Sequence, residues 1–161
     1  MGGLDARFLC AHLDPDRRVK AVVTVGTPHH GSAIAENLLE GWGVLPLVGR
    51  RIWREALNDL DPRTRARDVI LDRADVAYVS YAASRPRTEI PLAIRLAVGT
   101  LADENDGLVS VASARWGDFR GVVRADHFEL VGWSLSCSNR RIGRPFEHVA
   151  FWQKIVTEQI D

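Results

Sequence analysis

The sequence has little cysteine, no net charge and no long apolar run, and each of these absences excludes a class of protein. Its two cysteines, Cys10 and Cys137, are too few for a disulfide framework. Cys10 stands among apolar residues at helical spacing, so we expect a small buried side chain there. Lysine and arginine together number 21, as do aspartate and glutamate, so no bulk positive charge attracts nucleic acid. The most apolar stretch, residues 90–102, is broken by Arg95 and is shorter than the roughly 18 residues of a membrane span.

What the sequence does contain is ordinary for a globular protein. It has 161 residues, 46% hydrophobic and 26% charged, which is enough for a domain with a buried core. The basic residues are mostly arginine and form two clusters, at 50–54 and 63–67. Because the overall charge is balanced, solvated helix faces are favoured over a nucleic-acid surface. No signal peptide is visible, so the chain reads as cytoplasmic unless a leader stands upstream.

Short strands alternate with helices along the chain. Helical spacing of apolar residues predicts helices at 3–13, 33–42, 47–60 and 145–160. Compact β-branched runs predict strands at 19–26, 75–83 and 121–126. This alternation is typical of an α/β protein with parallel strands flanked by helices. Three strands make a thin parallel sheet, so residues 1–161 are expected to form the second half of a larger domain.

Polar groups gather where the predicted strands end, in residues 27–32, 102–110 and 125–129. The last two segments hold an aspartate and then a histidine, Asp106 and His127. An orienting carboxylate and a general-base imidazole in this order are two of the three groups of a hydrolase triad. Asp103 is the alternative acid, and a satisfied surface histidine is the plainer interpretation of His127.

The first residues raise a separate question, because a turn that opens a helix normally receives a strand. Gly2 and Gly3 follow Met1 and lead directly into the predicted helix. The turn of a G-x-S-x-G motif ends in this way, with the nucleophilic serine one position before that of Met1. We therefore expect a strand and a Gly-x-Ser upstream of Met1.

Four segments together resemble bacterial and fungal triacylglycerol lipases of the α/β-hydrolase fold. They follow one another in the family's order and read MGGLDARFL, VVTVGTPHHGS, NDGLVSVASARWG and DHFELVGW. One such motif would be a weak signal, but four in order are a strong one. The resemblance covers residues 1–133 and implies the C-terminal half of an α/β-hydrolase, with the N-terminal half missing.

The resemblance also implies roles for individual residues. Asp106 matches the triad acid and His127 matches the triad base. Gly2 and Gly3 match the elbow glycines, and the backbone N–H of Met1 matches a donor of the oxyanion hole.

The resemblance implies no obligatory cofactor. Some lipases of this family bind calcium beside the triad histidine, and Glu129 matches one ligand position. No partner aspartate stands in residues 82–88, and one carboxylate falls far short of the six to eight oxygens calcium takes. Calcium is therefore not expected, although it stays open. Neighbouring His29 and His30 do not form a metal site with other ligands, and one of them is expected to brace the loop beneath the elbow.

Residues 33–60 resemble the short cap of these lipases. Their apolar side chains would either cover an acyl pocket as a lid or pack as ordinary core, and both interpretations stay open. The candidate side chains are Trp42, Leu45, Leu47 and Trp53.

The expected activity is hydrolysis of a lipid or other carboxylic ester by a Ser-Asp-His triad whose serine lies upstream. The alternatives are a non-catalytic truncated fragment or binding remnant, and a transacylase on the same scaffold. Ser32 and Ser110 are the substitute nucleophiles in the chain, although neither stands in a glycine-flanked turn. Without an upstream strand, residues 19–26 would form an unprotected edge, so the chain alone is expected to self-associate there.

Overall fold

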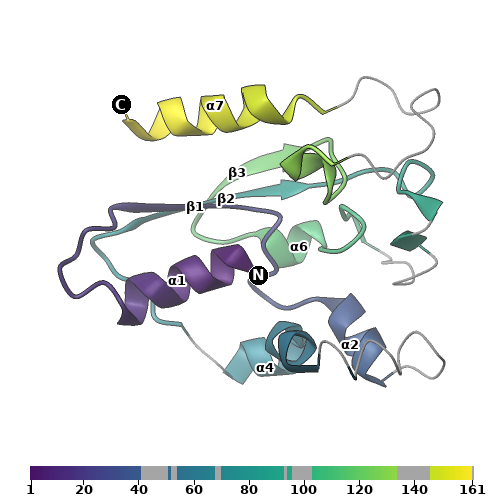
Figure 1. The fold of residues 1–161 in the computed structure, drawn as a ribbon, viewed down its shortest axis with the longest axis horizontal. Coiled ribbons are helices and arrows are strands. Elements are labelled where there is room, and N and C mark those ends of the chain that lie inside the picture. The colour runs from purple at the N-terminus through teal and green to yellow at the C-terminus, as the bar shows by residue number, and fades with distance from the viewer. Residues whose placement is uncertain are drawn as a thin grey trace.

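The computed structural model is an α/β arrangement around one parallel sheet (Figure 1). It describes residues 1–40, 51, 54–67, 70–92, 94–95, 103–133 and 146–160. The elements are α1 (Gly2–His12), β1 (Ala21–Val25), α2 (Ala33–Glu40), α4 (Pro62–Arg67), β2 (Ala77–Ala83), α6 (Val111–Ala114), β3 (Asp118–Val123), the 3-10 helix η1 (Glu129–Val131) and α7 (His148–Ile160). Residues 54–60 are also helical.

The three strands are all parallel, as the alternation of elements predicts, and the structure places them in the order β1-β2-β3. The third strand is shifted from its predicted place, because it begins at Asp118 and ends at Val123 rather than spanning 121–126. An irregularity in register between Ser80 and Tyr81 accompanies this shift. Within the described sheet β1 is an edge strand, as the prediction for residues 19–26 requires.

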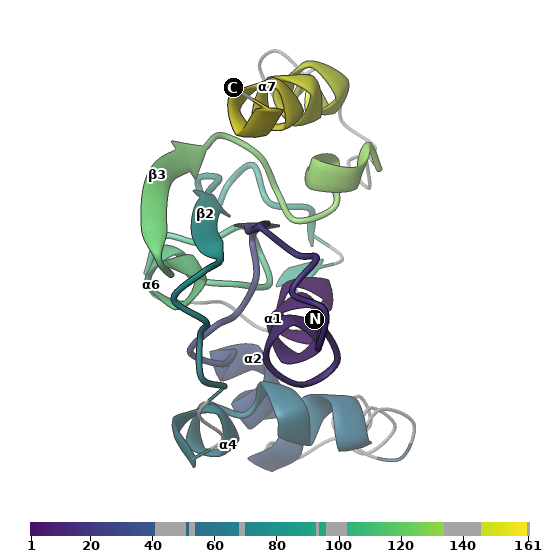
Figure 2. The same cartoon turned by 90° about the vertical axis from the view of Figure 1, so that its left-hand side faces the viewer.

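The sheet lies between two helical layers, with α7 on one side and α1 on the other (Figures 1 and 2). Val22 packs on the side of α1, in a cluster with Cys10 and Val76. Val79 and Tyr81 of β2 pack on the opposite side against Ile155 of α7. Burial of both faces explains why the strand runs are apolar without strict alternation of polar residues. The expected buried position of Cys10 is confirmed, at 2% exposure.

The apolar residues at helical spacing on the first helix, Leu4, Phe8, Leu9 and Leu13, are not all directed into the core. Phe8, Leu9 and Leu13 are exposed, whereas the buried side chains of α1 are Leu4, Arg7 and Cys10. An arginine lies on the buried face because a deep polar network receives it, as described below. Helical spacing alone could not distinguish these two faces, because both carry residues three or four positions apart.

Every strand ends in a loop at the same edge of the sheet, and these loops hold the candidate residues of the site. Gly26 follows β1, Ser84 and Arg85 follow β2, and Arg124 follows β3. No helix among the described residues is long and apolar enough to cross a membrane. The four lid candidates, Trp42, Leu45, Leu47 and Trp53, lie outside the described residues.

Candidate active site

The structure brings Asp106 and His127 into direct contact. His127 Nδ1 lies 2.7 Å from Asp106 Oδ2, and the backbone N–H of His127 donates to the carbonyl of Asp106 at 2.9 Å. The two residues come from different loops, before α6 and after β3. An ionised carboxylate can only accept, so Nδ1 carries the proton, and Nε2 is the nitrogen left to accept one.

The Asp106 carboxylate is held rigidly by its own loop. Its side chain is fully buried, and Oδ1 accepts the backbone N–H groups of Leu108 at 2.9 Å and Val109 at 2.7 Å. Gly107 makes this turn possible, because its φ of +99° suits glycine and its N–H donates to Asn105 Oδ1 at 2.8 Å. Both carboxylate oxygens are therefore engaged, and Oδ2 is directed at the imidazole.

His127 lies in a tight turn, and its imidazole ring is partly exposed. The side chain of His127 is 33% exposed, which leaves one side of the imidazole accessible from solvent. Asp126 closes the turn, since its Oδ1 accepts the N–H groups of Phe128 and Glu129, each at 2.9 Å. Burial raises the pKa of the Asp126 carboxyl, and the neighbouring carboxylate of Glu129 raises it further.

Gly26, at the end of β1, packs directly beneath the pair. Its φ is +59°, and a Cβ there would lie 3.1 Å from Asp106 Oδ2 and 3.0 Å from Leu130 Cδ1. The same Cβ would lie 3.6 Å from His127 Nδ1. Glycine is thus required both for the backbone conformation and for space against the carboxylate.

The start of α1 reaches the same end of β1. Met1 caps the helix, and its carbonyl accepts the N–H of Leu4 at 2.7 Å. A Cβ on Gly3 would lie 2.3 Å from Thr27 Oγ1 and 2.9 Å from Thr24 Cγ2, so the helix approaches the strand more closely than any side chain permits. Gly2 has open space instead, with nothing within 4 Å of its Cβ position. The structure therefore gives the two predicted elbow glycines different surroundings.

The alternative acid and nucleophiles occupy other positions. Asp103 is exposed, and its carbonyl accepts a hydrogen bond from Asn105 Nδ2. Ser32 donates its hydroxyl proton to the carbonyl of Leu108 at 3.1 Å. Ser110 caps α6 by accepting the N–H of Ser113 at 3.2 Å. The two serine hydroxyls are thus engaged in structural hydrogen bonds.

Of the neighbouring His29 and His30, one was expected to brace the loop after the first strand, and His29 is the one that does so. Its ring is buried, whereas His30 is exposed. The His29 Nδ1 accepts from Arg7 Nη1 at 3.3 Å, and Nε2–H then donates to Thr24 Oγ1 at 3.0 Å. Trp116 stacks beside His29 and lies 3.6 Å from the Arg7 guanidinium carbon. Burial, and then the positive charge of Arg7, lowers the pKa of His29 to about 3, so the ring is neutral.

Glu129, the position matched to a calcium ligand, is occupied by an ion pair. Its Oε1 and Oε2 accept from Nη2 and Nε of Arg85, both at 2.9 Å. The described residues contain no group of three or more His, Cys, Asp or Glu side chains arranged to hold a metal ion. A calcium ion does not fit beside this guanidinium, because both carboxylate oxygens are taken and the neighbouring charge is positive. Arg85 was not expected from the sequence, where its only signal is an arginine two residues after a predicted strand.

The fold matches those of solved lipases and esterases. A metagenomic carboxyl esterase aligns with a TM-score of 0.70 and 26% identity, covering 96% of this chain and 52% of its own. The fold is that of an α/β-hydrolase. The mature form of a Bacillus licheniformis lipase aligns at 0.57 with 23% identity, over 78% of this chain and 55% of its own. Staphylococcus hyicus lipase aligns at 0.58 with 15% identity, over 89% of this chain and 57% of its own.

A sequence relative points the same way. Triacylglycerol lipase 2 of Saccharomyces cerevisiae is 25% identical over 155 residues, which cover 83% of this chain and 44% of the yeast protein. No protein-family model matches the chain. The resemblance to lipases and esterases of the α/β-hydrolase fold is thus confirmed. The chain spans about half the length of the proteins it matches.

Proposed function

We propose that this α/β-hydrolase chain supplies the acid and base of a carboxylic-ester hydrolase, acting with a serine upstream of Met1. One observation carries the proposal, namely the 2.7 Å contact between His127 Nδ1 and a buried Asp106 carboxylate that also accepts two backbone N–H groups. Such a carboxylate cannot rotate away, so it holds the imidazole in the tautomer whose Nε2 is a base.

The arrangement around β1 supports an upstream nucleophile. Gly3 at the start of α1 lies against Thr27, and Gly26 lies against Asp106 and His127, so both features meet the same strand end. A serine one residue before Met1 would stand at the N-terminus of α1. There the backbone N–H of Met1, which is a peptide N–H in a longer chain, would donate to the developing oxyanion.

The reaction would follow the two-step course of serine hydrolases. The serine oxygen attacks the ester carbonyl while His127 Nε2 takes its proton, and the carbonyl oxygen becomes an oxyanion facing the Met1 N–H. The imidazolium then gives its proton to the leaving alkoxide, which departs as the alcohol and leaves an acyl-enzyme. Water repeats the sequence and releases the carboxylic acid and the free serine. Asp106 stabilises the imidazolium throughout and keeps its own charge.

The substrate class rests on the relatives. The yeast relative is named as a triacylglycerol lipase, and one of the structural matches is a carboxyl esterase. We assign an ester of a fatty acid or another acyl ester to this site, without choosing between water and an alcohol as the acyl acceptor. No cofactor enters the scheme.

The competing function is a non-catalytic fragment, and extension upstream tests the two against each other. The chain extended through a strand and Gly-x-Ser should hydrolyse a short-chain aryl ester, whereas the 161-residue chain should not. In the extended protein, His127→Ala should lower kcat on the order of 10³-fold or more, and Asp106→Asn somewhat less. Asp103→Asn is the matched control and should change kcat little.

Two results would contradict the proposal. Turnover by the 161-residue chain that is lost in Ser32→Ala or Ser110→Ala would mean that the nucleophile lies within it. A larger loss in Asp103→Asn than in Asp106→Asn would mean that the acid is misassigned.

A further inference from the structure

Arg85 is a buried cation placed between the two loops of the acid–base pair. It lies two residues after the end of β2, and its side chain is 2% exposed. Buried arginines are rare unless they are paired, and the guanidinium of Arg85 is paired on both sides. Nη1 donates to Glu89 at 3.0 Å, while Nε and Nη2 form a bidentate pair with Glu129.

The guanidinium holds the loop that carries His127. Glu129 Oε2, which accepts from Arg85, also accepts the backbone N–H of Asp126 at 2.8 Å. Asp126 in turn accepts the N–H groups of Phe128 and Glu129. Hydrogen bonds to the carboxylates of Asp126 and Glu129 therefore hold the turn that contains His127. The Glu129 carboxylate is in turn fixed by the bidentate guanidinium of Arg85.

The backbone of the same residue holds the loop that carries Asp106. The N–H of Arg85 donates to the carbonyl of Asn105 at 3.0 Å. The preceding residue, Ser84, donates its N–H to Val123, at the end of β3. One residue thus contacts the acid loop through its backbone and the base loop through its side chain, so its position sets the separation of the two loops.

We infer that Arg85 is a positioning residue, whose buried guanidinium keeps His127 Nδ1 at hydrogen-bond distance from Asp106 and does so without a divalent cation. This inference rests on the proposed roles of Asp106 and His127. The local charges are consistent with it, because Arg85 and the exposed Arg124 balance the carboxylates of Glu89 and Glu129. Removal of Arg85 would leave Glu129, whose side chain is 12% exposed, as an unpaired charge beside the buried Asp126. The turn would open to hydrate Glu129 and would carry His127 away from Asp106.

The test observes the imidazole itself, so it does not depend on catalysis. The protein extended upstream through the serine is labelled with ¹⁵N-histidine, and His127→Gln identifies the signal of His127. In the unaltered protein the Nδ1–H proton should be visible, protected from exchange and bonded to a nitrogen of the Nδ1–H tautomer. In Arg85→Gln this signal should disappear and the Nε2–H tautomer should become populated. Arg85→Lys, which keeps the charge without the bidentate fork, should give an intermediate result.

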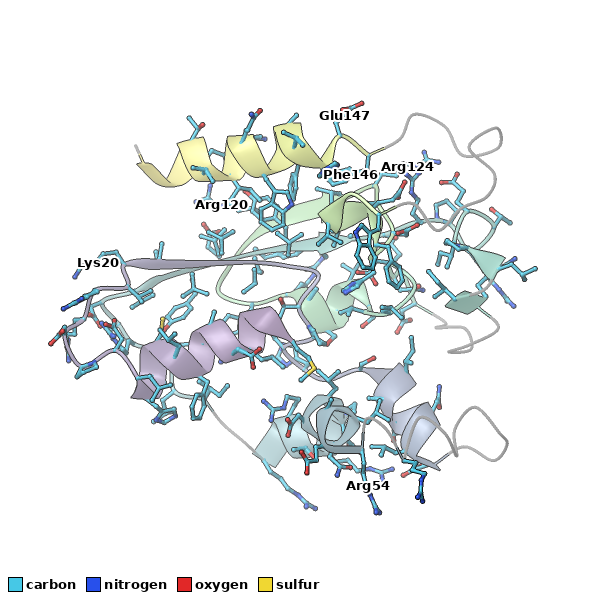
Figure 3. The ribbon with its side chains drawn as sticks, in the orientation of Figure 1. Lys20, Arg54, Arg120, Arg124, Phe146 and Glu147 are labelled. Carbon is cyan, nitrogen blue, oxygen red and sulfur yellow. The ribbon has the colours of Figure 1, made fainter. Side chains whose placement is uncertain are left out.

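Arg124 offers a matched control. It binds the same Glu89, but its side chain is 66% exposed and it directly follows the carboxyl end of β3 (Figure 3). Arg124→Gln should leave the His127 signal unchanged. If Arg85→Gln does not fold, Glu129→Gln reports the same effect, because the neutral amide cannot form the bidentate ion pair and should also loosen His127.

Three results would overturn the inference. One is an Arg85→Gln or Glu129→Gln protein with lower stability but an intact Nδ1–H signal, since Arg85 would then be structural only. The second is an equal loss in Arg124→Gln. The third is a His127 signal that changes when calcium or a chelator is added to the unaltered protein, since a cation would then set the loop.

Failure of the proposed function would look different. If the extended, serine-bearing protein is indifferent to His127→Ala, the catalytic role is wrong even where Arg85 still controls the His127 tautomer. If it depends on His127, Arg85→Lys should lower kcat at least several-fold with KM little changed, and Arg124→Gln should not.

Discussion

The neutral, buried His29 should make the stability of this protein depend on pH in a way that one substitution removes. In the folded chain the pKa of His29 is lowered from 6.5 to about 3, mainly by burial. As pH falls, His29 therefore becomes protonated in the unfolded chain at a higher pH than in the folded chain. Stability from this group is fully present above pH 6.5, is lost as pH falls below 6.5, and stops changing below about pH 3.

The size of the effect follows from the two pKa values. Between pH 7.5 and pH 5.0 the linkage relation gives a loss of about 2 kcal/mol from His29 alone. This figure hardly changes if the folded pKa is as high as about 4, because at pH 5 the folded ring is neutral in either case. It is a substantial part of the 5–15 kcal/mol that stabilises a typical domain.

His29→Gln is the perturbation of choice. Its amide can accept from Arg7 and donate to Thr24, as the ring does, but it does not titrate. At pH 7.5 the variant should be less stable by about 1–3 kcal/mol, because the stack on Trp116 and part of the hydrogen bonding are lost. At pH 5.0 the difference should shrink by about 2 kcal/mol, so the two proteins should become nearly equal.

Urea unfolding followed by far-UV circular dichroism, at both pH values and one ionic strength, measures this difference. His12→Gln is the matched control, since its ring is exposed rather than buried. A difference for His29→Gln that is the same at pH 7.5 and pH 5.0 would refute the reasoning, because His29 would then titrate alike in both states.

Two other predictions follow from the packing at β1. Gly26→Ala should destabilise the protein by about 1–2 kcal/mol and lower kcat in the extended protein, since the new methyl group meets Asp106 and Leu130 at a φ of +59°; unchanged unfolding and kinetics would contradict this. The 161-residue chain alone should self-associate through the edge at residues 19–26, with light scattering showing species larger than a monomer. A monodisperse monomer with a sharp cooperative melt would mean that this edge needs no upstream strand.

Local pattern was sufficient for most of the fold. Helical spacing at 3–13 and the β-branched run at 19–26 became α1 and β1 with small changes at their ends. The third strand was placed too late, because the residues before Gly121 carry charges that conceal an edge strand, whereas pairing with β2 begins at Asp118. The parallel orientation of the strands followed from their alternation with helices, whereas their order is known only from the structure.

Motif order was likewise sufficient to select Asp106 and His127 as the candidate pair, and to expect a brace from one histidine of the pair at 29–30. It could not say which histidine, because burial of His29 rather than His30 depends on Arg7 and Trp116 arriving from other elements. The sequence by itself therefore determined the α/β class and the candidate residues of the site, because periodicity and turn chemistry are local.

Only the tertiary structure decided which faces and charges are covered. Arg7 lies inward on α1 while Phe8 and Leu9 lie outward, since a buried network receives the arginine. Arg85 meets Glu129 44 residues further along the chain, a pairing that no local spacing encodes. Such contacts depend on how parallel strands bring their carboxyl ends to one edge, and the resulting geometry, rather than composition, sets the environment of each titratable group.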